Sequence, residues 1–441
     1  MPALRTARSG WAYALLWAAT RALVVMMALG PLRISGLDVT SDVSVIYQGW
    51  YEVLRTGTFP LDDVTWQYPP AAGLVMLLPG ALGAVLRVSY LHAFLVVVAA
   101  ADATAARLLW RAGAPRGARG AREAAARAGA GPSRAGAWYW LASVPLLGPT
   151  VYARYDLVVT VVAVAGLLAM ATRPRLGGAL AGLGTMIKVW PVLTVIGLPR
   201  GRRVRDGLAV CALTVGAIAL FFAATTHGAY AFLGFQKDRG VEVESLGGTV
   251  FQLARGFFGW SGTVSMNYGS LEFLGPGVSV VAKASVALTA LAFCWLLLWR
   301  WRANRWSAAT PLDAALVALM LFTVTSRVIS PQYLVWLLGL AAVCVSVRGT
   351  RMRPVAWLLL PACVLTTLEF PVLFGDVVYG HPLGATLVVL RNLLLVAATV
   401  LAARRLWHST VAVPTPPPAL VPPTRRSAAL RAGDGEHAAA D

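Results

Sequence analysis

Long apolar runs are the feature that most constrains how this chain can fold. Four of them, residues 11–29, 208–224, 278–299 and 383–403, approach the roughly 20 residues that an α-helix needs to cross a bilayer. Charged residues make up only 13% of the 441 residues, whereas a soluble domain carries roughly a quarter. We therefore predict an integral membrane protein. Because no small-residue cleavage site follows the first run, we expect this run to remain as a span.

The formal net charge of +19 raises the question of nucleic-acid binding, but the distribution of the charge argues against it. Basic residues gather at the ends of apolar runs, and no basic segment elsewhere is interleaved with the aromatic residues that stack on bases. Basic residues beside membrane spans are retained in the cytoplasm, so we interpret them as a topology signal and expect no nucleic-acid partner. They are Arg5 and Arg8, six arginines from Arg111 to Arg134, Arg173 and Arg175, and basic residues within 200–205, 300–305, 348–353 and 404–405.

A cytoplasmic amino terminus places all of these clusters on the cytoplasmic side. It predicts an all-α, multi-pass cell-membrane protein with about twelve transmembrane helices over residues 1–408 and with both termini in the cytoplasm. Two long loops, 32–88 and 225–275, then lie outside, and the first of them contains an interfacial or re-entrant helix at 71–85. Residues 176–199 are expected to form two short spans broken at KVWP (188–191).

The remaining residues, 409–441, are rich in Pro, Ala and Arg and include the sequence PTPPPALVPPTRR. Such a segment cannot bury enough apolar area to order itself. We therefore predict a disordered cytoplasmic tail.

An acidic and aromatic segment, SDVSVIYQGWYEVLRTGTFPLDDVTWQYPP (41–70), follows the first predicted span and carries Asp42, Glu52, Asp62 and Asp63. Asp38 and Asp42 are four residues apart, which on a helix would place both on one face. A carboxylate in a partly desolvated interface is more basic than one in water, so either residue is a candidate general base. The alternative is that these carboxylates only solvate an outside loop.

Cations are predicted on the same side of the membrane. Arg154 and Asp156, in YARYDL, lie at the outer mouth of a short span, where they form either a functional pair or a structural salt bridge. Lys188, in TMIKVWP, lies inside an apolar segment. An ionisable group in such a position usually serves a site, and snorkelling or a buried ion pair is the alternative.

A further cation, Arg327, lies with Gln332 and Tyr333 in SRVISPQYLVW at an outer span boundary, where aromatic belt residues are also expected. Carboxylates suit the removal of a proton from a hydroxyl group, and Lys and Arg suit a phosphate whose negative charge grows as it leaves. Both fit a transferase that acts on a lipid-linked phosphate at the outer leaflet.

No metal or cofactor site is predicted. The cysteines lie in apolar runs without metal-binding spacing and are expected to be buried apolar residues, and the histidines lack companion ligands. No nucleotide-binding P-loop motif occurs, and a divalent ion that bridges Asp42 and a lipid phosphate is the alternative to a metal-free site. These residues are Cys211, Cys294, Cys344 and Cys363, and His92, His227, His381, His408 and His437.

Five segments in order carry a resemblance to a known family: SDVSVIY, LRTGTFP, YPPAAGLVMLLP, GGALAGLGTMIKVWPVL and SPQYLVWLLGL. Together they resemble the actinobacterial glycosyltransferases of family 87, which belong to the C superfamily and use polyprenyl-phosphate sugars. The resemblance runs from about residue 11 to residue 405. It implies a polytopic helical fold with juxtamembrane helices in a long first outside loop.

The resemblance also implies a reaction. An Asp near the start of the first loop, matched by Asp42 with Asp38 as the fallback, would deprotonate a hydroxyl of a glycan or glycolipid acceptor. The oxygen would attack the anomeric carbon of a polyprenyl-phosphate sugar with inversion, and the lipid phosphate would leave. Lys188 matches the lysine of the family's K-x-x-P segment, and it is assigned with Arg154 and Arg327 to that phosphate.

Mannose, and after it arabinofuranose, is the sugar that the resemblance implies. Tyr47, Tyr68, Asp156, Gln332 and Tyr333 are the further residues expected to contact substrate. The chain departs from the family pattern at one of them, because Gln332 stands where relatives often carry a histidine.

A transporter or flippase for a lipid-linked sugar is the competing interpretation, because helices broken near the middle of the membrane form substrate sites in such proteins. Against it, no internal repeat is visible and the two outside loops are long, and long loops are usually functional. A structural scaffold for a cell-envelope complex is a third interpretation.

Overall fold

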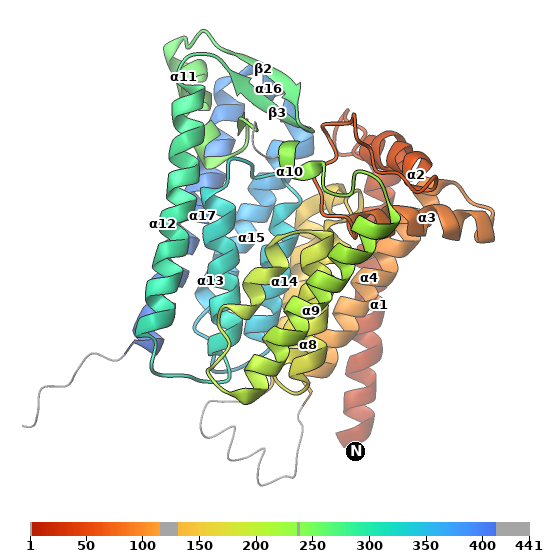
Figure 1. Ribbon diagram of the computed structural model, residues 1–441, viewed down its shortest axis with the longest axis vertical. Helices are drawn as coiled ribbons and strands as arrows, with labels where there is room; N and C mark the ends of the chain where they lie inside the picture. The colour runs from red at the N-terminus through yellow and green to blue at the C-terminus, as the bar shows by residue number, and fades with distance from the viewer. Residues whose placement is uncertain (1, 115–130, 236–238, 412–441) are drawn as a thin grey trace, which may run out of the picture.

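The computed structural model describes residues 2–114, 131–235 and 239–411, which form a bundle of helices with a smaller lobe at one end (Figure 1). Within these ranges, six helices are long and apolar enough to cross a membrane. The chain is therefore a polytopic membrane protein, and the count of about twelve spans stays a prediction. Five of these spans lie in α1 (Pro2–Leu29), α4 (Tyr90–Ala112), α9 (Arg202–Thr225), α12 (Val278–Arg302) and α17 (Pro382–Thr410), and the other runs through α15 (Arg353–Thr367) into η4 (Leu368–Val372).

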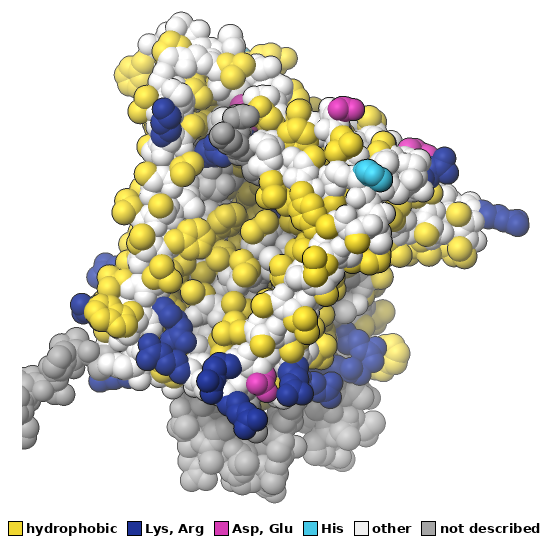
Figure 2. Space-filling model, in the orientation of Figure 1, with side chains coloured by type: hydrophobic (Ala, Val, Ile, Leu, Met, Phe, Trp, Pro, Cys, Tyr) yellow, Lys and Arg dark blue, Asp and Glu magenta, His cyan; other side chains and the backbone are white. Residues whose placement is uncertain are grey.

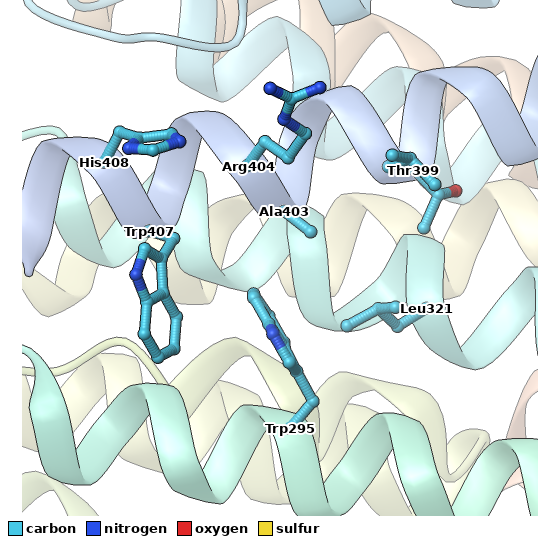
Figure 3. A pocket seen from close by; sticks show the side chains of 8 residues that line it. Trp295, Leu321, Thr399, Ala403, Arg404, Trp407 and His408 are labelled. Atoms are coloured by element: carbon cyan, nitrogen blue, oxygen red, sulfur yellow. The ribbon is translucent and has the colours of Figure 1, made fainter.

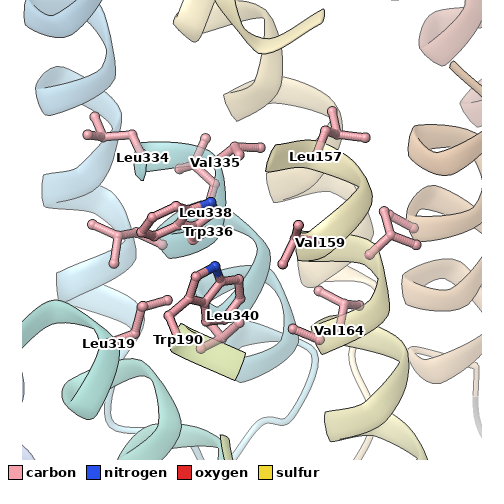
Figure 4. Close-up of a cluster of buried hydrophobic side chains, with 14 of the residues drawn as sticks. Leu157, Val159, Val164, Trp190, Leu319, Leu334, Val335, Trp336, Leu338 and Leu340 are labelled. Carbon is pink, nitrogen blue, oxygen red and sulfur yellow. The ribbon is translucent and has the colours of Figure 1, made fainter. Parts of the chain in front are cut away.

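Shorter helices form the interior of the bundle. They are α6 (Ala135–Ser143), α7 (Asp156–Met170), α8 (Pro174–Ile187), α13 (Thr310–Thr325) and α14 (Tyr333–Val345). All residues of α14 after the first are buried, whereas only 17% of the apolar stretch of α9 or α12 is buried. A helix that is apolar on every side is buried in protein or faces lipid. Here the inner helices are buried in protein, and the outer helices face lipid. Figure 4 shows the packing where α7 and α14 meet, with Trp190 and Trp336 among the buried side chains.

The lobe caps the end of the bundle opposite the amino terminus (Figure 1). It contains a three-stranded antiparallel sheet in the order β1-β3-β2, in which Glu242 pairs with Glu272. Tyr268 and Gly269 have φ of 45° and 75°, which suits the tight hairpin between β2 and β3. The all-α prediction is therefore right for the bundle and wrong for this sheet. The lobe comprises α10 (Phe232–Phe235), β1 (Val241–Glu242), α11 (Leu246–Phe258), β2 (Thr263–Asn267), β3 (Ser270–Leu274), η4 (Leu368–Val372) and α16 (Phe374–Tyr379).

The predicted first loop contains three helical segments, a π-helical turn η1 (Asp42–Tyr47), α2 (Gln48–Leu54) and α3 (Ala72–Leu86). Figure 1 shows α3 projecting sideways from the bundle, across the direction of α1 and α4. The interfacial position of α3 stays a prediction.

Charge divides the two ends of the molecule. In Figure 2, Lys and Arg side chains gather over the end where α1 begins, and most of the visible Asp and Glu side chains lie at the other end. Most of the arginine-rich loop and the predicted tail, at 115–130 and 412–441, lie outside the described residues. The predicted tail begins at 409, whereas α17 continues to Thr410, whose hydroxyl accepts a hydrogen bond from Trp299 Nε1 at 2.9 Å.

A groove of about 290 Å³ lies between α12, α13 and α17 (Figure 3). Its walls are mostly apolar and include Trp295, Leu321 and Trp407, with Arg404 and His408 at the basic end of α17. The described residues that line it include no carboxylate. This groove therefore does not hold the carboxylate base that the sequence predicts.

A buried ion pair ties α1 to the interior. Arg21 Nε lies 2.7 Å from Asp102 Oδ2, and the two side chains are 4% and 0% exposed. Asp102 also accepts hydrogen bonds from Trp140 Nε1 at 2.6 Å and from the Tyr152 hydroxyl at 2.8 Å. Asp102 thereby joins α1, α4, α6 and the 3-10 helix η2 (Val144–Tyr152).

Asp102→Ala is expected to destabilise the protein by about 3–5 kcal/mol, because it leaves the Arg21 guanidinium buried without a counter-charge. Thermal unfolding of the detergent-purified protein measures the loss. The matched control is Glu52→Ala, which breaks an exposed pair with Arg55 and should leave the melting temperature unchanged. Equal melting temperatures for wild type and Asp102→Ala would contradict this account.

Candidate active site

Lys188 lies where the chain breaks out of a helix. Helix α8 ends at Ile187, and Lys188 is extended, with φ −155° and ψ 134°. Had the helix continued, the ring of Pro191 would have clashed with the carbonyl of Ile187. The chain instead turns into the 3-10 helix η3 (Trp190–Val195). Six residues of 3-10 helix extend about 12 Å, so the prediction of two short spans is wrong for the second piece.

The Lys188 ammonium is held by a carboxylate inside a cage of rings. Its Nζ lies 2.6 Å from Asp156 Oδ1, and the side chains are 12% and 2% exposed. Trp336 Nε1 donates to the same oxygen at 2.8 Å. Four ring centroids lie 4.8–5.3 Å from Nζ, those of Tyr68, Tyr155, Tyr333 and Trp336, and cation–π attraction adds to the ion pair.

A second ion pair fixes the start of the first loop. Arg154 Nη2 lies 2.7 Å from Asp42 Oδ2, and Arg154 Nη1 donates to the carbonyls of Val39 at 3.2 Å and of Ala153 at 2.8 Å. Arg154 thus holds both the segment before η1 and the carboxylate at its first residue. The Asp42 side chain is 36% exposed, which leaves part of this carboxylate open to a ligand.

Tyrosine rings connect the two ion pairs. Tyr155 lies 5.1 Å from Tyr68 and 5.9 Å from Tyr47, measured between centroids, and both contacts are edge-on. Burial raises the pKa of Tyr68, the carboxylates of Asp156 and Asp42 raise it further, and the guanidinium groups of Arg239 and Arg154 oppose the shift. The charges of both ion pairs therefore act near one ring. Asp42, Arg154, Asp156, Lys188, Tyr47, Tyr68 and Tyr333 form one cluster, which we call the Lys188 site.

Asp38 lies outside this cluster. It precedes η1 instead of sharing a helical face with Asp42, so the prediction that both lie on one face is wrong. Its Oδ1 accepts hydrogen bonds from Thr40 N at 2.9 Å and Thr40 Oγ1 at 2.7 Å, which make the local turn that starts the helix. The Thr40 hydroxyl bond is the main cause that lowers the pKa of Asp38.

The candidates on SRVISPQYLVW divide between two places. Tyr333 begins α14, stacks on Trp336 at 3.9 Å and faces Lys188, and Gln332 precedes it as the helix cap. Arg327 lies beside the second loop, where its guanidinium donates to the carbonyl of Arg239. Burial and the neighbouring charge of Arg239 lower the pKa of Arg327. Arg327 therefore contacts the second loop, whereas Tyr333 contacts the Lys188 site.

The sequence interpretation missed Arg239. Its positive charge acts on Lys188, Tyr68 and Tyr333, so the second loop adds a cation beside the Lys188 site. The only signal in the sequence was one arginine in an otherwise acidic part of that loop, RGVEVE. No group of three or more His, Cys, Asp or Glu side chains that could hold a metal ion occurs among the residues described.

A comparison with protein-family models gives one match, to the model described as glycosyltransferase family 87, over residues 66–331. This match covers more than half of the chain. The chain belongs to glycosyltransferase family 87. No curated protein and no solved structure matches it. The matched region of this membrane glycosyltransferase contains Tyr68, Arg154, Asp156, Lys188 and Arg327. Tyr333 lies just after it, and Asp42 lies well before it.

Proposed function

We propose that this family 87 glycosyltransferase moves a sugar from a polyprenyl-phosphate donor to a hydroxyl of a lipid-linked or cell-envelope glycan. The reaction takes place on the outer face of the membrane and inverts the anomeric centre. Mannose is the first candidate for the sugar and arabinofuranose the second. The observation that carries the proposal is that a part-exposed carboxylate, Asp42, shares one tyrosine-lined cluster with Arg154 and Lys188.

Asp42, Lys188 and Arg154 have different roles in the proposed reaction. Asp42 accepts the proton of the acceptor hydroxyl, and the freed oxygen forms a bond to the anomeric carbon. The bond between that carbon and the phosphate oxygen breaks, and its electron pair leaves with the lipid phosphate. Lys188 and Arg154 then compensate the charge that grows on the phosphate. Because both cations are held by carboxylates in the free protein, they are already oriented before substrate binds.

The lengths of the helices suit a donor that stays in the lipid. Helices α7, α8 and α14 contain 15, 14 and 13 residues, so each is about 20–23 Å long. A bilayer core is about 30 Å thick. If their basic ends lie at the cytoplasmic surface, then Asp156, Lys188 and Tyr333 lie below the opposite surface. A phosphate on a long isoprenoid chain can reach that depth from within the leaflet.

The aromatic residues suit the sugar. Tyr68 and Tyr333, which are half-buried, border the charged groups with flat apolar faces and polar edges, and such rings pack against the C–H faces of a pyranose or furanose. Tyr47 and Tyr155 are buried, so they support the site and do not face the sugar. The proposed outer location rests on the positive-inside rule, because basic side chains gather at the end of the bundle remote from this site.

A transfer assay tests the proposal. Membranes that contain the protein are supplied with radiolabelled polyprenyl-phosphate mannose, polyprenyl-phosphate arabinofuranose or a nucleotide sugar, each with and without EDTA. We expect transfer from one of the polyprenyl-phosphate sugars, in EDTA as well as without it, and none from the nucleotide sugar.

The other outcomes separate the alternatives. Transfer from the nucleotide sugar alone would overturn the proposed donor class. Transfer that EDTA abolishes would instead support a divalent ion between Asp42 and the phosphate. Lipid-linked sugar counterflow in proteoliposomes without any new glycosidic bond would favour the flippase.

A further inference from the structure

The second loop brings a guanidinium group to the Lys188 site with unused hydrogen-bonding capacity. Among the described residues, the closest carboxylate oxygen to Arg239 Nε is Glu272 Oε1 at 3.6 Å, which is too long for a hydrogen bond, and none of those residues gives this buried Nε a hydrogen-bond partner. Arg239 Nη2 donates to Ser270 Oγ at 3.2 Å. A buried donor without a partner is costly, and an anion at this position would supply one.

Arg239 is held at its backbone by the segment 326–332, which leads into α14. The Arg327 guanidinium donates to the Arg239 carbonyl, and Glu242 N donates to the Arg327 carbonyl at 3.0 Å. The Glu242 carboxylate accepts hydrogen bonds from Ile329 N at 2.5 Å and from Ser330 Oγ at 2.9 Å. These bonds join β1 to the segment that places Tyr333 over Lys188.

We propose that Arg239 is a third phosphate-binding residue, and that Glu242 is the positioning residue that holds β1 and the segment 326–332 together so that Arg239 and Tyr333 face Lys188. This inference rests on the proposed polyprenyl-phosphate donor. It assigns to the second loop a share of the donor site, whereas the carboxylate that accepts the proton comes from the first loop.

The surroundings of Glu242 explain why its hydrogen bonds to the segment 326–332 respond to pH. Burial raises the pKa of Glu242 to about 7, against the opposing effects of Arg239, of the bonds from Ser330 and Ile329, and of Arg391. The other titratable groups of this cluster are Glu244, Glu272 and Glu369. Below pH 7 the protonated carboxyl loses its charge, and its bonds to Ile329 and Ser330 weaken.

The test uses the full-length protein in detergent or nanodiscs and measures KM for the polyprenyl-phosphate sugar. Arg239→Gln is expected to raise donor KM by about 10- to 100-fold, as for the loss of one charge-assisted hydrogen bond. Glu242→Gln is expected to raise it about tenfold, and acceptor KM should stay within about twofold. In the double variant, Glu242→Gln should add little to Arg239→Gln, because it acts through that residue.

Two matched controls accompany these variants. Glu244→Gln makes the same change in the same buried cluster without touching the segment 326–332, and Lys283→Gln removes one exposed positive charge at the start of α12. Both should keep donor KM within about twofold. In the wild type, donor KM should rise as pH falls from 8 to 6, and Glu242→Gln should abolish this rise. A phosphodiester donor keeps its charge over that range, so the change reports on the protein.

Hydrogen exchange gives a readout that needs no activity. Glu242→Gln, and more mildly Ser330→Ala, should speed exchange of the amides in 326–332, and Glu244→Gln should not. Unchanged exchange, or full multiplication of the two KM effects, would overturn the positioning role. If the wild type binds a polyprenyl phosphate in a way that Arg239→Gln weakens, yet transfers no sugar, the proposed reaction fails and this inference stands.

Discussion

Asp42→Asn is expected to lower kcat by about 10²- to 10⁴-fold, the contribution that a positioned general base makes. The amide keeps the size of the side chain and can still accept a hydrogen bond from Arg154 through its oxygen, but it cannot take a proton from the acceptor hydroxyl. Donor KM should change only a few-fold, because Lys188 and Arg154 still face the phosphate. Initial rates with labelled donor, at saturating acceptor, measure the effect.

Asp38→Asn is the matched control for this experiment. It makes the same change four residues earlier, on an exposed side chain whose Oδ1 accepts two bonds from Thr40, and an asparagine oxygen can accept the same bonds. Its rate should stay within about twofold of the wild type. If Asp38→Asn is the inactive variant and Asp42→Asn is active, the assignment of the base is reversed.

The apolar runs predicted the membrane bundle because span length and hydropathy are properties of single segments. The same is true of the break at Lys188, since Pro191 prevents the helix from continuing through its own segment. Lys188 could also be singled out from the sequence, because a charge in an apolar segment is costly. Each of these features is determined by residues close to it in the sequence, and each of them is present in the structure.

What the sequence could not supply is pairing across long separations. Arg154 holds Asp42, which lies 112 positions earlier, and Lys188 takes Asp156 as its counter-charge. Before the structure, Arg154 and Asp156 suggested a pair with each other. The small sheet was missed for the same reason, because β1 has only two residues and is defined by its partner β3. The positions of Arg239 and Glu242 depend on that sheet, so their contacts could not be predicted without it.

Lys188→Met is expected to have two separable effects. It removes a cation from the site of the leaving phosphate, which should lower kcat/KM for the donor by about 10²- to 10³-fold, as the loss of one preorganised electrostatic contact does. It also leaves the Asp156 carboxylate, 2% exposed, without its counter-charge, which should destabilise the fold by about 3–5 kcal/mol. Thermal unfolding and donor kinetics on the same preparation measure both.

The double variant Asp156→Asn with Lys188→Met separates these effects. With both charges gone, no uncompensated charge is buried, and the Trp336 indole can still donate its hydrogen bond to the amide oxygen. The melting temperature should return most of the way to that of the wild type, because replacing both partners of a buried pair is far less costly than replacing one. Transfer should stay as low as in Lys188→Met, because the phosphate has lost its cation. Recovery of transfer along with stability would instead make the pair a structural salt bridge, with Arg154 and Arg239 left as the phosphate-binding groups.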